Sequence, residues 1–153
     1  MLIVGETERS IDEKQRISIP KEMREFFAME NGPSIVYATP GANGSIWLYP
    51  KAAFESRANV MESSLLPNED EMELEQILFS QTTRLEIDRT GRIRLPEMLL
   101  SFAGIDGQAI ILGVRDHLAV VNPKSWEVMK QDGLPKLKEI MARIRSKKEK
   151  KPC

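Results

Sequence analysis

The sequence is poor in the residues that form disulfides, zinc centres and nucleophilic active sites. Among its 153 residues, Cys153 is the only cysteine and His117 is the only histidine. A single cysteine cannot form an intramolecular disulfide, and without a CxxC pattern or a Cys/His cluster there is no basis for a structural zinc site. With His117 as the only histidine, the sequence spacing pairs no nucleophilic side chain with a general base, as a nucleophilic active site would require. We therefore expect no metal, no cofactor, no small-molecule substrate and no enzymatic activity. An enzyme that acts through carboxylates alone stays open as a residual alternative, since 23 acidic residues always supply pairs, but nothing singles out one pair.

Long apolar runs are also missing. No uncharged stretch approaches the roughly 20 residues that a membrane-spanning helix needs, and residues 1–4 are too short for the core of a signal peptide. The HExxH, GxGxxG and P-loop patterns are absent as well. We expect a cytoplasmic protein with no membrane partner. Its hydrophobic content of 41% fits one compact domain, or two small halves that share a core.

Charge is balanced overall but unevenly distributed. The 22 Lys and Arg residues face 23 Asp and Glu residues, for a formal net charge of -1. The stretch 61–83 holds six acidic and no basic side chains, whereas 134–153 holds eight basic and two acidic ones. The sequence therefore has an acidic middle and a basic tail.

The basic tail, residues 136–151, admits three interpretations. It could attract DNA non-specifically, with a strong dependence on salt. It could cover the acidic helix expected around 69–75, within the chain or across a protomer boundary. It could also be a solvated tail that frays.

The chain contains an internal repeat. The segment 12–20, DEKQRISIP, returns 76 residues later as 88–96, DRTGRIRLP. Further on, 46–51, IWLYPK, corresponds to 119–124, AVVNPK, at an offset of 73, so the first copy carries three extra residues. These fall in a run of turn residues, 39–44, where an insertion costs little.

Each copy is predicted to form a strand, a turn, a strand, a short helix and two more strands. Polar and apolar residues alternate in 16–19 and 92–95, as in a strand with one buried face, so Ile17, Ile19, Ile93 and Leu95 should point inward. The later strands are expected at 34–39 with 45–49, and at 108–114 with 117–121.

Prolines and apolar spacing define the short helices. Pro20 and Pro96 are expected at the first helical position. Gly104 should end the second helix. The apolar stripes of the two helices comprise Met23, Phe26 and Phe27 in the first copy, and Leu99, Phe102 and Ala103 in the second.

Helices are also expected between and after the copies. Residues 50–64 and 68–80 should join the copies, and Asn68 with Glu71 resembles a capping box. Asn122 and Pro123 should open a further helix, and the final amphipathic helix should present Leu137, Ile140, Met141 and Ile144. Because neither copy can bury its sheet alone, we expect the two to pack into one barrel with pseudo-twofold symmetry.

An Asp-x-x-x-Arg turn occurs in both copies. One such match means little, but two at the same offset, each followed by the same strand-Pro-helix pattern, form a specific signal. An Asp at the start of a turn can accept backbone N–H bonds and fix the loop, so that the Arg four residues later projects beside it. Gly91 suits a left-handed backbone, and Gln15 at the equivalent place would cost about 1 kcal/mol if the backbone is the same.

These motifs resemble the MraZ family, the two-repeat branch of the SpoVT/AbrB family. Two DxxGR-like motifs, the FAG segment at 102–104 and the Pro-x-x-Trp-Glu segment at 123–127 are shared, over residues 1 to about 130. The resemblance implies an α+β fold with a double AbrB/SpoVT-type swapped-hairpin barrel made from two internal repeats. The implied divisions are a first repeat at 1–54, an acidic helical connector at 55–82, a second repeat at 83–127, and a basic helix and tail at 128–153.

The functional implication is a transcription factor that binds double-stranded DNA as a ring-shaped homo-oligomer. It would act at the nucleoid on the division and cell-wall gene cluster that contains its own gene. In the family, the DxxxR residues of neighbouring protomers lie together on the DNA-facing surface. The positions implied here are Asp12, Lys14, Arg16, Asp88 and Arg92.

Two departures from the family pattern stand out. Gln15 replaces the usual glycine of the first motif, which bears on the DNA-reading loop. Residues 119–122, AVVN, lack the tryptophan often found on that strand, which bears on packing.

Other interpretations remain open at this point. The Asp–Arg pairs could be only ion pairs that stabilise turns. Arg9, Arg89 and Arg94 could contact phosphates or simply be solvated. The chain could also be an AbrB-type antitoxin, although those chains typically carry one copy of the motif, or an interaction scaffold that does not bind DNA.

Overall fold

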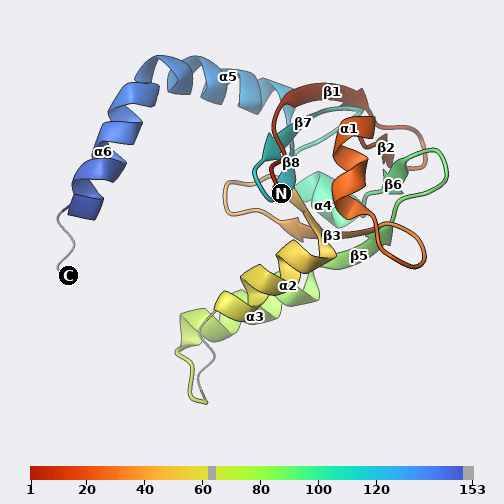
Figure 1. The fold of residues 1–153 in the computed structure, drawn as a ribbon, viewed down its shortest axis with the longest axis horizontal. Helices are drawn as coiled ribbons and strands as arrows, with labels where there is room; N and C mark the ends of the chain where they lie inside the picture. The colour runs from red at the N-terminus through yellow and green to blue at the C-terminus, as the bar shows by residue number, and fades with distance from the viewer. Residues whose placement is uncertain (62–64, 150–153) are drawn as a thin grey trace. The chain divides into compact units, whose positions relative to one another are not determined.

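The computed structural model describes residues 1–61 and 65–149. The chain divides into two units, Met1–Asn122 and Pro123–Cys153, and each is described by itself. The first unit contains both sequence repeats (Figure 1). It is therefore the unit in which the two turns can meet.

Each repeat contributes four strands to the first unit, which is an α+β structure. An antiparallel six-stranded sheet has the order β1-β7-β8-β4-β3-β5, and β2 pairs with β6 in a separate two-stranded ribbon. The predicted hairpins are confirmed as β3–β4 and β7–β8. The strands are β1 (Glu6–Ser10), β2 (Arg16–Ser18), β3 (Ile35–Pro40), β4 (Ile46–Pro50), β5 (Thr83–Glu86), β6 (Arg92–Arg94), β7 (Gln108–Val114) and β8 (His117–Val121).

The two repeats are interleaved in the sheet. Strand β1 of the first repeat pairs with β7 of the second, and β5 of the second pairs with β3 of the first. Exchanging each strand for its equivalent in the other repeat reverses the sheet order and leaves the pairings unchanged, which is pseudo-twofold symmetry. The pairs β4–β8 and β2–β6 join equivalent strands. Neither repeat can therefore complete its hydrogen-bonded sheet without the other.

The hydrophobic core draws on both repeats in similar measure. The four ribbon and post-ribbon residues predicted to point inward, Ile17, Ile19, Ile93 and Leu95, are each at most 1% exposed. They pack in one cluster with side chains of both sheet halves. Other members are Ile3, Phe27, Val36, Ile46, Leu48, Leu99, Ile111, Leu118 and Val120.

The short helices follow the ribbon strands, with two corrections to the sequence prediction. Helix α1 (Lys21–Arg24) continues into a 3-10 turn, η1 (Glu25–Phe27), and α4 (Glu97–Phe102) is its counterpart. Pro20 and Pro96 are N-caps and not first helical residues, because their ψ angles of 139° and 141° are extended. The predicted stripe is wrong at Phe102, which is 47% exposed because α4 buries Leu99 and Leu100 instead.

Two helices connect the repeats. Helix α2 (Lys51–Val60) ends earlier than the predicted Ser64, since Met61 is already extended, and residues 62–64 lie outside the described part of the chain. Helix α3 (Glu69–Ser80) begins at the predicted cap: the Asn68 side chain accepts the Glu71 N–H at 2.8 Å. The second hydrogen bond of this capping box joins the two side chains, with Asn68 Nδ2 donating to Glu71 Oε1 at 3.1 Å.

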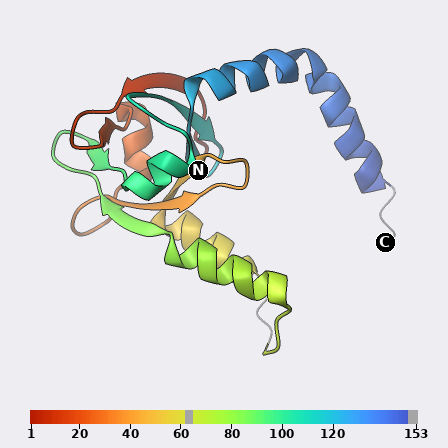
Figure 2. The ribbon, with the colours of Figure 1, turned by 180° about the vertical axis from the view of Figure 1, so that it is seen from behind.

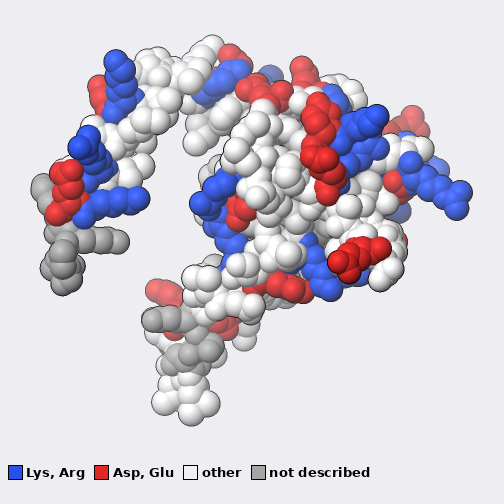
Figure 3. All heavy atoms as spheres, in the orientation of Figure 1, with Lys and Arg blue, Asp and Glu red and all other residues white. Residues whose placement is uncertain are grey.

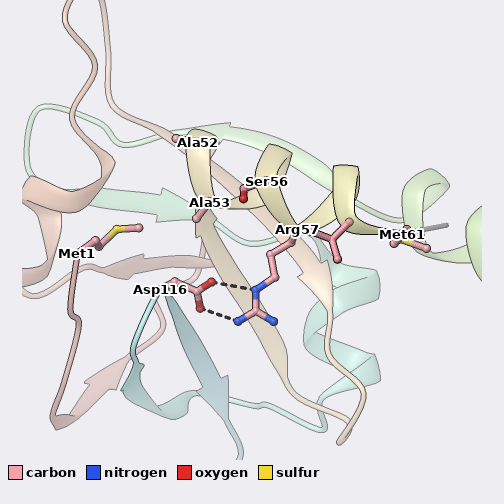
Figure 4. Close-up of a pocket in the computed structure, with 8 residues that line it drawn as sticks. Met1, Ala52, Ala53, Ser56, Arg57, Met61 and Asp116 are labelled. Carbon is pink, nitrogen blue, oxygen red and sulfur yellow. Dashed lines mark hydrogen bonds and ion pairs between the residues drawn. The ribbon is translucent and has the colours of Figure 1, made fainter. Parts of the chain in front are cut away.

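Helix α2 is tied to the second repeat by a bidentate ion pair (Figure 4). Arg57 Nε and Nη2 donate to the two carboxylate oxygens of Asp116 at 2.8 and 2.9 Å, and His117 Nδ1 lies 2.9 Å from Asp116. Partial burial raises the pKa of Asp116, but the hydrogen bonds from Arg57 and His117 outweigh it and lower that pKa to about 2. The pair fixes α2 against the β7–β8 turn.

The second unit is helical. It comprises α5 (Pro123–Gly133), the 3-10 turn η2 (Leu134–Lys136) and α6 (Leu137–Glu149). Pro123 is the first residue of α5 as predicted, and the final helix is confirmed. Tail residues 150–151 lie outside the described chain. Over residues 1–61 and 65–149, no helix is long and apolar enough to cross a membrane.

Candidate nucleic-acid interface

The two Asp-x-x-x-Arg segments form turns of the same construction. In the first, Asp12 N donates to Arg16 O at 3.0 Å and Gln15 N donates to Asp12 O at 3.0 Å. In the second, Asp88 N donates to Arg92 O at 2.9 Å and Gly91 N donates to Asp88 O at 3.0 Å. The repeat seen in the sequence is therefore a repeat of backbone geometry.

The Asp12 carboxylate organises the first turn. Its Oδ1 accepts the backbone N–H groups of Lys14 and Arg16, each at 2.9 Å. Its Oδ2 accepts Arg16 Nε at 2.8 Å, which holds the guanidinium beside the turn. The Asp thus fixes the loop and directs the Arg, which is the role that the motif spacing predicts.

The second turn adds the hydroxyl of Thr90, which the Asp-x-x-x-Arg spacing does not indicate. Asp88 Oδ1 accepts Thr90 N at 2.9 Å, Thr90 Oγ1 at 2.8 Å and Arg92 N at 3.0 Å. Arg92 Nε donates to Thr90 Oγ1 at 2.8 Å and lies 3.5 Å from Asp88 Oδ2. Thr90 therefore stands between Asp88 and Arg92. The sequence does contain a sign of this role: a hydroxyl residue stands two positions after the Asp in the second motif and not in the first.

The ribbon brings the two turns together. Arg16 of β2 lies opposite Arg94 of β6, and Leu95 N donates to Gln15 O at 2.9 Å. Arg92 Nη1 of the second turn lies 3.6 Å from Asp12 Oδ2 of the first. Figures 1 and 2 show the two turns side by side from opposite directions. Residues 76 positions apart in the sequence thus form one surface, which we name the paired-turn surface (residues 12–16 and 88–94).

Most of the predicted site residues lie on this surface. Lys14 and Arg89 are exposed in the turns, and Arg94 is exposed on β6. Figure 3 shows basic side chains projecting at the edge where Figure 1 places the turns, with acidic side chains among them. Arg9 differs: it is half-buried on β1, opposite Ala109 in the large sheet. The structure therefore does not bring Arg9 into the ribbon.

The two turns are not electrostatically equal. Residues 12–16 carry two acidic and two basic side chains, whereas the equivalent residues 88–92 carry one acidic and two basic ones, and Arg94 on β6 adds a third cation. Arg24 of α1 adds a further cation to the second turn, since its guanidinium packs against Gly91. In the equivalent place of the other repeat stands Leu100, which lines a hollow with Gln15. The second turn is therefore the more cationic of the two.

Gln15 and Gly91 share the left-handed backbone that the repeat predicts. Their φ angles are 63° and 83°. A side chain at Gln15 is accommodated beside Leu100, whereas a Cβ at Gly91 would overlap the Arg24 guanidinium. The departure from the family pattern at Gln15 therefore changes the side chain and not the course of the turn.

Substitutions at these two positions should change stability in opposite directions. Gln15→Gly removes the strain of a left-handed backbone, about 1–2 kcal/mol, but raises the conformational entropy of the unfolded chain, which costs about 0.4–1 kcal/mol. The free energy of unfolding should therefore rise by about 0.5 kcal/mol. Gly91→Ala should cost about 1–2 kcal/mol, because the added strain and the displacement of the Arg24 guanidinium together outweigh the gain from a stiffer unfolded chain. Urea unfolding of both variants measures this. A loss for Gln15→Gly, or no loss for Gly91→Ala, would contradict the assigned backbone.

The turn carboxyls are held in the ionised form. The Arg92 backbone N–H, followed by the Thr90 hydroxyl, lowers the pKa of Asp88 from 3.8 to about 2. The Arg16 backbone N–H is the largest cause that lowers the pKa of Asp12. Each carboxylate is therefore a permanent acceptor at neutral pH, and its paired Arg stays oriented.

Acid should weaken the fold through these carboxyls. Because their folded pKa values lie below the unfolded ones, their stabilisation is present above about pH 4 and is lost as pH falls toward 2. Thermal unfolding between pH 5 and 2 should show a falling midpoint, and Asp88→Asn should flatten that fall only in part, because Asp12 and Asp116 also have lowered pKa values. An identical pH dependence in Asp88→Asn would refute the assignment for Asp88.

Comparison with known proteins identifies relatives of the chain. The family model described as "MraZ protein, putative antitoxin-like" matches residues 78–140, which include the second turn. A protein named "Transcriptional regulator MraZ" from Roseiflexus castenholzii is 32% identical over 82% of this chain and 85% of its own length. Proteins of the same name from Mesoplasma florum and Syntrophomonas wolfei are 31% and 32% identical, over 94% and 91% of this chain and 96% and 94% of their own lengths.

Proposed function

Because the chain belongs to the MraZ family, we propose that this transcriptional regulator binds double-stranded DNA sequence-specifically through its paired-turn surface. The observation that carries the proposal is the contact between the turns, where Arg92 of one repeat reaches Asp12 of the other at 3.6 Å. This contact makes one surface with several oriented cations. Such a surface suits the phosphate contacts that supply most of the affinity for DNA.

In this proposal the residues of the paired-turn surface make different kinds of contact with DNA. Arg16 is held directly by Asp12, and Arg92 is held through the Thr90 hydroxyl that Asp88 positions. Both are assigned to base edges, because Arg pairs bidentately with guanine in the major groove. Lys14, Arg89 and Arg94 supply phosphate contacts. The Asp residues act as positioning residues, since a carboxylate itself repels DNA.

The fold that we assign to this function is the double AbrB/SpoVT-type barrel. The interleaved pairing of β1 with β7 and of β5 with β3 supports swapped hairpins. The repeats would span 1–54 and 83–127, with a connector at 55–82 and a basic helix and tail at 128–153.

A single paired-turn surface makes few contacts, so we propose that several copies act together. A ring of identical copies could present several such surfaces along one face of a duplex. Short tandem repeats in the DNA, spaced by about one helical turn of 10–10.5 base pairs, would then be bound simultaneously. The proposed target is the division and cell-wall gene cluster that contains the protein's own gene, which would place the protein at the nucleoid.

Footprinting on the DNA upstream of that cluster tests this proposal. We expect protected blocks at intervals of about one helical turn. Probes trimmed to one block should bind at least about tenfold more weakly than the full array, because avidity is lost. Equal affinity for one block and for the array, with the protein monomeric, would contradict cooperative binding by an oligomer.

The description of the family model favours one other function, that of an antitoxin. An antitoxin of this type would also bind DNA, but in addition it would bind and neutralise a toxin protein. Two covalently joined copies of the motif speak against it, since single-copy chains are typical of AbrB-type antitoxins. A toxin-like reading frame beside the gene whose product binds the purified chain would favour the antitoxin function.

A further inference from the structure

Helix α3 has an outer apolar strip that no other described residue of the first unit covers. Its inner side packs on α2, where Phe79 meets Phe54 with ring centroids 6.2 Å apart. On its other side, Leu74 and Ile77 are each 54% exposed. Residues three apart share a helix face, so these two side chains form one patch. We name it the α3 strip.

The α3 strip is bordered by negative charge. Helix α3 carries five acidic side chains and no basic one. Asp70 and Glu73 lie on the same side of the helix as Leu74 and Ile77, by the 100° rotation per residue. An apolar patch with an acidic border needs a partner that is apolar and basic.

Helix α6 of the same chain has these two properties. Leu137, Ile140, Met141 and Ile144 follow the spacing i, i+3, i+4, i+7 and form one stripe, which we name the α6 strip. No side chain of this helix, residues 137–149, is buried in its own unit, and Met141 and Ile144 are 60% and 51% exposed. Figure 3 shows basic side chains along α6.

Cations border the α6 strip on both sides. Helix α6 carries five basic and two acidic side chains. By helical rotation, Lys138 and Arg145 flank the strip on one side, and Arg143 and Lys147 flank it on the other. Arg145 Nε lies 3.3 Å from Glu149, so its charge is partly offset within the helix. The helix is thus complementary to α3 in both apolar pattern and charge.

We propose that the α6 strip of one copy docks on the α3 strip of a second copy. Every copy carries both strips, and we place them on two different neighbours: each copy gives α6 to one neighbour and receives α6 from the other, which makes the contact heterologous. Heterologous contacts between identical chains close into rings when the rotation between neighbours permits. This inference rests on the proposed assembly of several copies, but it is independent of DNA contact by the turns.

Disulfide trapping between differently tagged chains tests the docking. In a Cys153→Ser background, one chain carries Leu74→Cys and the other carries Ile144→Cys. After subunit exchange and mild oxidation, we expect a cross-linked heterodimer. Ser146→Cys, about half a turn around α6 from Ile144, is the matched control and should give at least about tenfold less product, because it faces away from the strip.

Charge reversal tests the same contact by sedimentation velocity at low salt. Glu73→Lys and Lys147→Glu should each raise the dissociation constant of the assembly by about tenfold, and the two together should restore most of the loss. A chain with Arg16→Ala and Arg92→Ala should cross-link like its parent, which separates this inference from the DNA interface.

Three results would overturn the docking proposal. The first is an oligomer that forms without the Leu74–Ile144 cross-link, which leaves the ring proposal standing. The second is a disulfide that forms only inside a chain carrying both cysteines. The third is a chain that stays monomeric at every concentration, which would also overturn the proposed ring.

Discussion

An Ile93→Ala substitution is expected to lower the free energy of unfolding by about 2–5 kcal/mol, and to destabilise both repeats together. Ile93 is 1% exposed and lies opposite Ile17, which is fully buried, in the two-stranded ribbon. Removing its outer carbons leaves a cavity between the repeats. Because the sheet is interleaved, the loss should reach strands of the first repeat that Ile93 does not touch.

A tryptophan in the first repeat can report this coupling. In a Trp126→Phe background, Trp47 on β4 is the only remaining tryptophan. Urea unfolding at one protein concentration should show the same lowered midpoint by Trp47 fluorescence and by circular dichroism. Leu65→Ala is the control, since Leu65 is 96% exposed and should change little. A Trp47 transition that keeps its parental midpoint would show that the repeats unfold separately.

Removal of the paired arginines is expected to have the largest effect on DNA binding. Arg16→Ala or Arg92→Ala should each reduce affinity by about tenfold, and the double variant by about a hundredfold or more, because each bidentate contact to a base contributes about 1–3 kcal/mol. These ratios refer to a probe that holds a single block, and on the full array, where several protomers bind together, the losses multiply. Fluorescence anisotropy at fixed salt, on single-block and on full upstream DNA, measures both.

The matched control removes an arginine elsewhere. Arg115 is exposed in the turn between β7 and β8, beside the Asp116 that pairs with Arg57. Arg115→Ala changes net charge by the same amount as Arg92→Ala and should reduce affinity by less than about threefold. Equal losses for the two variants would mean that net charge, and not the paired turns, determines affinity.

Much of the fold could be predicted because the two copies of the sequence constrain each other. The alternation of polar and apolar residues in 16–19 and 92–95 identifies the side chains that are buried. The turn residues 39–44 hold the three extra residues of the first copy. The pairing of β1 with β7 was not predictable in detail, since no local pattern records which distant strand is the partner. The prediction is wrong at Phe102 because apolar spacing in a helix of only six residues does not determine which side faces the core.

The candidate site was predictable as a motif but not as a surface. Asp12 and Arg16 were identified by their spacing, and the structure shows the hydrogen bonds that the spacing implies. The contact between Arg92 and Asp12 depends on ribbon register, which spacing does not contain. Arg24 stands where the other copy has Leu100, and its packing on Gly91 follows from tertiary structure alone.

The most direct test of the account compares selectivity between two DNAs. The parent protein and the Arg16→Ala, Arg92→Ala double variant are titrated, at fixed near-physiological salt, onto the DNA upstream of the protein's own gene cluster and onto a shuffled control. We expect the parent to prefer the upstream DNA by at least about a thousandfold and the double variant to lose most of this preference. Equal, weak binding of the parent to both DNAs, unchanged in the double variant, would show that the paired turns are structural and that the partners are proteins.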